Sequence, residues 1–138
     1  MTPDERAAFL TAGTRTAKVS TARANGAPHV APVWFVLDGD DVIFTTGSQT
    51  VKGKALARDS RIALCVDDEN PPFAYVMIEG IAELSADLDE MLMWATRIGG
   101  RYMGAENAEA FGRRNAVPEE RLVRVRPTRV IARAGISD

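Results

Sequence analysis

The chain has 138 residues, 46% of them hydrophobic and 26% charged, a composition typical of one globular domain with its own core. Its formal net charge of -2 gives no general excess of basic residues, so we expect neither nucleic acid nor an anionic membrane as a partner. Cys65 is the single cysteine and His29 the single histidine, which excludes an intrachain disulfide and argues against a Cys/His metal site.

The N-terminal segment is charged and lacks the apolar core of a signal peptide. No stretch of the chain approaches the ~20 apolar residues that cross a bilayer, so the expected location is cytoplasmic. The same segment predicts a short helix over residues 3–10, because Thr2 can cap it and Pro3 suits its first position.

A β-hairpin is expected next. Residues 15–21 are rich in β-forming side chains and lead into Asn25-Gly26, a pair typical of tight turns because both residues tolerate positive φ. The partner strand, residues 28–37, is apolar on both faces, so we expect both to be covered, the outer one by a helix, a ligand or another subunit. Pro32 lacks a backbone donor, which indicates an edge or a bulge.

The rest of the chain alternates short strands with helices. Strands are expected over residues 42–46, 62–66, 73–84, 121–126 and 129–133, the last two divided by Pro127, and helices over 51–58, 87–102 and 106–114. The longest helix carries an apolar stripe formed by Leu88, Met91, Leu92, Ala95, Ile98 and Tyr102. Antiparallel hairpins with inserted helices predict one mainly β domain over residues 1–138, a barrel and not a doubly wound parallel sheet.

Residues 43–54 form the strongest candidate for a binding site. A strand ending in hydroxyl residues passes a glycine and enters a helix, whose free N–H groups and positive dipole end favour an anion. Further donors for a phosphate are Thr45, Thr46, Ser48, Thr50, Lys52 and Lys54, although the Walker pattern is absent. The residue pattern alone favours a simpler alternative, a helix capped by Ser48 or Thr50 with two solvated lysines.

The apolar stretch 28–35 is interpreted equally well as support for a planar ring and as a plain core or interface strand. A histidine can act as an acid or a base, but no nucleophile pattern accompanies His29, which favours a structural or cofactor-orienting role over catalysis. Phe73 and Tyr75 share a strand face and could border a pocket or pack in the core.

On the longest helix, Trp94, Arg97 and Arg101 lie together at helical spacing. The favoured interpretation is a solvated face with one partly covered aromatic side chain. The alternative is a basic rim that reaches an anionic cofactor tail. Cys65 lies in an apolar run and is expected to be a buried, inert thiol.

Three stretches together resemble a known family. They are Gly26-x-Pro28-His29-Val30-x-Pro32-Val33-Trp34, then Phe44-Thr-Thr46, then Lys52-x-Lys54-x-Leu56-x-x-Asp59-x-Arg61-Ile-Ala-Leu64. In this order and spacing they are similar to the pyridoxamine 5'-phosphate oxidase-like split β-barrel superfamily, and most to its actinobacterial deazaflavin-dependent oxidoreductases of the B type, which use coenzyme F420. The likeness runs from about Phe9 to Ile131.

The resemblance implies an FMN-binding-like split β-barrel with inserted helices, a homodimer with two cofactor sites at the subunit interface. The residues it implies for the cofactor are Thr45, Thr46, Thr50, Val51 and Lys52 at the phosphate, Val30, Pro32 and Val33 at the ring, and Phe73 and Tyr75 at the pocket border. Related proteins often carry an arginine-rich loop where this chain has residues 47–50, so fewer charges are present to hold a polyglutamate tail.

The activity implied is hydride transfer from reduced F420 to an electron-poor small molecule such as an enone, a quinone or a tetrapyrrole-like compound. Because the cofactor supplies the chemistry, no catalytic constellation is required in the sequence. The proton comes from solvent or, as weaker candidates, from His29 or Tyr75. The alternatives are an FMN-binding oxidase or reductase of the same fold, and a non-catalytic protein that binds a flavin or a haem-like ligand.

Overall fold

The computed structural model describes residues 1–138, which form a seven-stranded antiparallel sheet and four α-helices. The strands are β1 (Ala17–Ala22), β2 (Pro28–Val33), β3 (Val36–Asp38), β4 (Asp41–Gly47), β5 (Arg61–Asp68), β6 (Ala74–Ser85) and β7 (Glu120–Arg133). The helices are α1 (Pro3–Thr11), α2 (Val51–Arg58), α3 (Leu88–Met103) and α4 (Ala108–Asn115), with the single 3-10 turn η1 (Ala105–Asn107) before α4.

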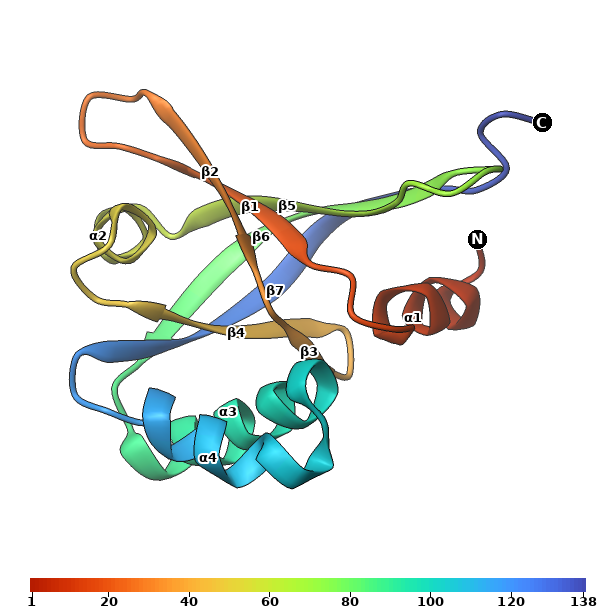
Figure 1. The fold of residues 1–138 in the computed structure, drawn as a ribbon. Coiled ribbons are helices and arrows are strands. Elements are labelled where there is room, and N and C mark those ends of the chain that lie inside the picture. Colours follow the sequence, from red (N-terminus) through yellow and green to blue (C-terminus); the bar gives the residue numbers. More distant parts are fainter.

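The strands follow one another in the order β2-β1-β5-β6-β7-β4-β3, and the sheet forms a split barrel in which the edge strands β2 and β3 are not paired with each other. Its two edge strands, β2 and β3, are separated in the chain by only Trp34 and Phe35, so the edges must approach one another. The prediction of one strand over residues 28–37 is therefore wrong, because this short crossover carries the chain from one edge to the other (Figure 1). The expected hairpin of β1 and β2 and the edge position of Pro32 are confirmed.

Strand β7 is continuous through Pro127, against the prediction of two strands divided there. Pro127 is opposite Gly80 at a register shift in the β6–β7 ladder, where a missing N–H is tolerated. A Cβ on Gly80 would lie only 2.6 Å from the carbonyl oxygen of Arg126, so the close approach of the two strands requires a glycine.

Helices α1 and α2 cover the barrel core from opposite sides (Figure 1). Helix α1 begins with a capping box formed by Thr2 and Glu5, and it contributes Leu10 to the core. Helix α2 contributes Leu56. Phe35 and Phe44 are fully buried in the same core. The helix predictions in both segments are confirmed to within a residue.

Helix α3 packs on the outer side of β4 and β7, where Met91 and Trp94 meet Ile43 and Leu122 in a second, smaller core. The predicted stripe is rotated, because Trp94 is buried whereas Leu88 and Leu92 are exposed. Helix α4 lies against α3, and together they form the layer below the barrel in Figure 1. No helix of the structure combines the length and the apolar character needed to cross a membrane.

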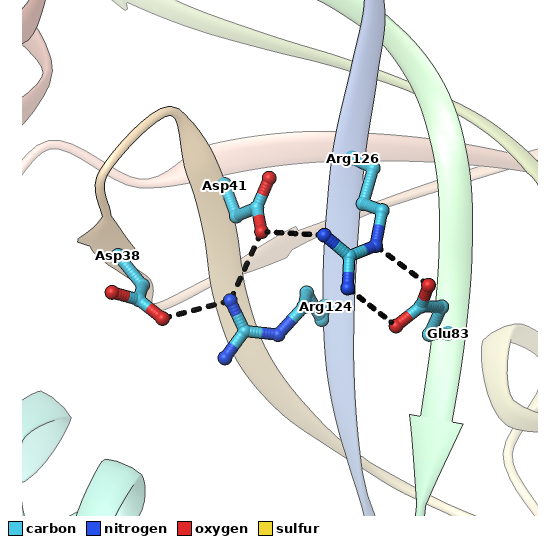
Figure 2. Close-up of polar contacts among 5 residues, drawn as sticks. All are labelled: Asp38, Asp41, Glu83, Arg124 and Arg126. Carbon is cyan, nitrogen blue, oxygen red and sulfur yellow. Dashed lines mark hydrogen bonds and ion pairs between the residues drawn. The ribbon is translucent and has the colours of Figure 1, made fainter.

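A network of ion pairs fastens the β3–β4 hairpin to β7 and β6 (Figure 2). Arg124 donates to Asp38 at 2.8 Å and to Asp41 at 3.0 Å, and its guanidinium lies 5.8 Å from the ring centre of Trp94. Arg126 bridges Asp41 and Glu83. Arg124 thus joins the short edge strand β3 to the small core beneath α3.

Candidate functional site

A hollow of about 410 Å³ lies where β2 ends and where β4 leads into α2. It brings together six of the residues predicted to bind a cofactor, and its other lining residues come from the position before β1, the crossover, the end of β4, α4 and β7. The predicted residues are Pro32, Val33, Thr45, Thr46, Thr50 and Lys52, and the others are Thr16, Trp34, Gly47, Asn115 and Glu120. Side chains distant in sequence thus meet at the junction of the sheet with α2.

The polar end of the hollow is the start of α2. The Thr50 hydroxyl caps this helix, since it accepts the N–H of Gly53 at 3.1 Å and donates to the carbonyl of Gly47 at 2.8 Å. Thr50 is therefore the helix cap that the simpler interpretation of the sequence predicted. The N–H groups of Val51 and Lys52 bond to no acceptor in the chain, which leaves two donors at the positive end of the helix dipole.

Lys52 provides a positively charged group that has no hydrogen bond or ion pair within the protein. Its side chain lines the hollow and forms no hydrogen bond or ion pair, whereas Lys18 and Arg124 each bind a carboxylate. An ammonium beside two free N–H groups is a donor set suited to a phosphate.

The loop that shapes this end packs closely against the helix. A Cβ on Gly53 would collide with the carbonyl of Gly47, and one on Gly47 would lie 3.0 Å from the Thr50 methyl group. Thr46, which is buried, contacts the Thr50 hydroxyl through its own at 3.2 Å. The geometry of this polar end of the hollow therefore depends on two glycines and two threonines.

The apolar wall of the hollow is formed by Pro32, Val33 and Trp34. The Trp34 indole stacks on Tyr102 of α3 with ring centroids 4.9 Å apart, and it also contacts Phe111 of α4 at 5.8 Å. This flat surface is therefore held by side chains from two helices.

Two residues at the end of α3 fix the crossover behind this wall. Arg101 donates to the carbonyls of Leu10, Gly13 and Phe35 at 2.7–3.0 Å. The Tyr102 hydroxyl donates to the carbonyl of Arg15 and accepts the N–H of Phe35. Arg101 is thus fully engaged within the protein and does not form a basic rim.

The sequence also predicted that Trp94, Arg97 and Arg101 form a solvated face. This prediction is wrong for Trp94 and Arg101. Trp94 is 5% exposed, and Arg101 is partly buried between α1 and the crossover. Only Arg97 is exposed, and its guanidinium lies 4.8 Å from the Trp94 ring centre. Cys65 is partly buried on β5, and burial raises the pKa of its thiol.

The remaining predicted site residues do not line the hollow within one chain. Val30 is 66% exposed on the outer face of β2, and the Val51 side chain is exposed on α2. Phe73 and Tyr75 lie at the start of β6, where Tyr75 is opposite Asp67 and Arg133. Within one chain, these residues therefore do not meet the polar end of the hollow.

His29 lies opposite Thr21 in the β1–β2 ladder. Its Nδ1 and the Thr21 Oγ1 are both buried without a hydrogen-bond partner. Neither His29 nor Tyr75, the two weak candidates for proton transfer, lines the hollow. The structure contains no group of three or more His, Cys, Asp or Glu side chains arranged so that they could hold a metal ion.

Sequence reasoning missed four lining residues, Thr16, Trp34, Asn115 and Glu120, as parts of the site. Glu120 is opposite Gly47 in the β4–β7 ladder, a pairing between segments more than 70 positions apart that no local pattern reveals. Burial raises the pKa of Glu120, and the nearby Lys52 opposes that shift. A signal was available only for Trp34, which belongs to the apolar stretch 28–35.

Comparisons with known proteins agree with this architecture. The family model described as pyridoxamine 5'-phosphate oxidase matches residues 2–134. The solved structure of the conserved hypothetical protein Rv2991 from Mycobacterium tuberculosis is 23% identical, with a TM-score of 0.86 over 99% of this chain and 87% of that one. No curated protein matches the chain significantly.

Two further solved structures bear names that point to different ligands. A protein described as an F420 reductase is 23% identical, with a TM-score of 0.72 over 90% of this chain and 94% of that one. A haem-binding protein from Mycobacterium smegmatis is 18% identical, with a TM-score of 0.67 over 99% of this chain and 60% of that one. At these identities the similarity establishes the fold alone.

Proposed function

The chain belongs to the pyridoxamine 5'-phosphate oxidase family, and from that premise we propose that it is an oxidoreductase that binds coenzyme F420. The cofactor phosphate is held at the start of α2, and its ring lies along the wall formed by Pro32, Val33 and Trp34. The substrate is an electron-poor small molecule such as an enone, a quinone or a tetrapyrrole-like compound.

The free ammonium of Lys52 carries this proposal. It lies in the same hollow as an apolar wall and next to two N–H groups that have no acceptor, so charged and flat parts of one ligand are both accommodated. The residues present therefore fit a phosphorylated tricyclic ring. When bound, the reduced cofactor supplies the hydride, while the chain orients the ring and excludes water from it.

A second copy of the chain completes the proposed site. The outer face of edge strand β2 exposes Pro28, Val30 and Pro32. The same face continues through Lys18 and Ser20 of β1 to the partly exposed Cys65 and Met77. An exposed, apolar sheet edge favours association with another chain. We propose a homodimer in which this face is covered and in which Val30, Phe73 and Tyr75 border the pocket from the two subunits.

The direct test is titration of the purified protein with F420, followed through quenching of the cofactor fluorescence. Lys52→Ala should weaken binding by about 1–3 kcal/mol, because a charge-assisted hydrogen bond to the phosphate is lost. The control is Lys54→Ala, which removes an exposed lysine from the same helix and should leave the affinity unchanged. Equal affinity in wild type and Lys52→Ala would contradict the phosphate site.

Two outcomes separate the competing functions. Tight binding of FMN with no binding of F420 would indicate a flavin enzyme of the same fold. Binding of F420 without turnover of any enone, quinone or tetrapyrrole acceptor would indicate a binding protein and contradict the proposed activity.

A further inference from the structure

Glu120 places a carboxylate in the hollow that holds Lys52. Its Oε1 lies 3.8 Å from the position that a Cβ on Gly47 would occupy, directly beside the loop that leads into α2. The side chain forms no hydrogen bond and no ion pair, although the residue is partly buried. An unpaired carboxylate at the edge of an anion site opposes the binding of any anion there.

Lys52 and Glu120 are the only charged residues that line the hollow. With Glu120 ionised, the positive charge of Lys52 is balanced and the lining has no net charge. A site for a highly charged phosphate would instead have a net positive lining. Lys52 favours the ionised form of Glu120, whereas burial and the neighbouring carboxylate of Glu119 oppose it. A pH of about 8 lies well above the ordinary pKa of a glutamate, about 4.3, and above the second pKa of a phosphomonoester, about 6.

We propose that Glu120 is a specificity residue that makes the site select a phosphodiester monoanion over a phosphomonoester dianion. The inference rests on the proposed function and concerns the choice of cofactor at that same site. FMN ends in a phosphomonoester, whose second pKa near 6 gives it a charge of about -2 at neutral pH. The phosphate of F420 links the ring side chain to the tail and is a diester with one negative charge.

Repulsion from a fixed carboxylate is proportional to the charge of the ligand. Glu120 therefore makes the binding free energy of a dianion less favourable, by about twice the amount for a monoanion in the same position. Expressed as dissociation constants, the effect on the dianion is the square of the effect on the monoanion. A threefold gain for a diester on removal of the carboxylate corresponds to a gain of about tenfold for a monoester.

The central comparison is between FMN and its methyl phosphodiester, which differ by one methyl group and by one negative charge on the phosphate. FMN and its methyl phosphodiester share one ring, and F420 is the third probe. Dissociation constants are measured at about pH 8 for wild type and Glu120→Gln, with Glu120→Ala as a second variant that removes the carboxylate differently. Glu119→Gln is the control, because it removes the same charge from an exposed position that does not line the hollow.

We expect Glu120→Gln to tighten FMN binding about tenfold and the binding of both diesters about threefold, with no change in Glu119→Gln. Equal gains for FMN and its diester, or weaker binding of all three ligands, would overturn the inference while leaving the proposed function intact. Failure of wild type and every variant to bind any of the three would overturn the proposed function and the inference together. Thermal unfolding of each variant verifies that the fold is retained.

Discussion

Trp34 and Tyr102 stack with their ring centroids 4.9 Å apart and their planes within 1° of parallel. Trp34 lies in the crossover between the two edge strands and Tyr102 in the last turn of α3, so this contact joins the point of barrel closure to the helical layer. The face of the indole that lines the hollow is thereby held in place. The stability of the fold and the shape of the candidate site therefore both depend on Trp34 and Tyr102.

Tyr102→Phe should lower the free energy of unfolding by about 1–3 kcal/mol, since it leaves the N–H of Phe35 and the carbonyl of Arg15 without their partner. The ring stack is retained in this variant, so the loss reports on the hydroxyl. Urea denaturation measures it. Tyr75→Phe is the matched control, because the Tyr75 hydroxyl has no hydrogen bond in the structure, and it should stay within about 0.5 kcal/mol of wild type.

Arg101→Met should lower the free energy of unfolding by about 2–4 kcal/mol, because three backbone carbonyls lose a charged donor. The same measurement on Arg97→Met provides the comparison, since Arg97 is exposed and contacts only the face of Trp94. That variant should change stability by less than about 1 kcal/mol. Similar losses in the two variants would show that the carbonyl contacts of Arg101 contribute little.

Val30→Asp should convert the proposed homodimer into a monomer and, at the same protein concentration, release the cofactor. Val30 is 66% exposed in one chain, so its replacement should barely affect the fold of that chain. Sedimentation velocity measures the association. Leu88→Asp is the control, because it places the same charge on another exposed apolar residue, at the start of α3 where an acidic side chain is favourable. A dimer that persists in Val30→Asp would exclude this face as the interface.

Stability should fall as the pH is lowered from about 4 to about 2, partly through Asp59. Arg61 donates to both oxygens of this carboxylate and lowers its pKa from 3.8 to about 2. A folded-state pKa below the unfolded value stabilises the protein at pH values above the unfolded pKa, and this contribution is lost as pH falls through the folded pKa. Urea unfolding at several pH values should therefore show a shallower acid dependence in Arg61→Gln than in wild type.

Local patterns predicted most elements because each depends on neighbouring residues. Thr2 and Thr50 cap the helices that follow them, and Asn25-Gly26 forms the turn between β1 and β2. The predictions failed where contacts between strands distant in sequence determine the local backbone structure. Pro127 is tolerated because Gly80 lies opposite it, and the strand after Pro28 stops at Val33 because the barrel must close.

The candidate site divides in the same way. Six of its residues were predicted from short segments around Pro32, Thr46 and Lys52, in part through resemblance to a family. Glu120 and Asn115 escaped prediction because they reach the hollow from β7 and α4. Arg101 was open to two interpretations, a solvated face and a basic rim, and its three carbonyl acceptors contradict both.

The sequence by itself determined a β-rich fold and the capped start of the helix that carries Lys52, because turns, caps and apolar periodicity act over a few residues. Only the tertiary structure decided that this lysine shares its hollow with a carboxylate and that Trp34 forms a fixed wall beside it. The reason is physical, since charge and shape at a site are sums over side chains that meet only when the barrel closes.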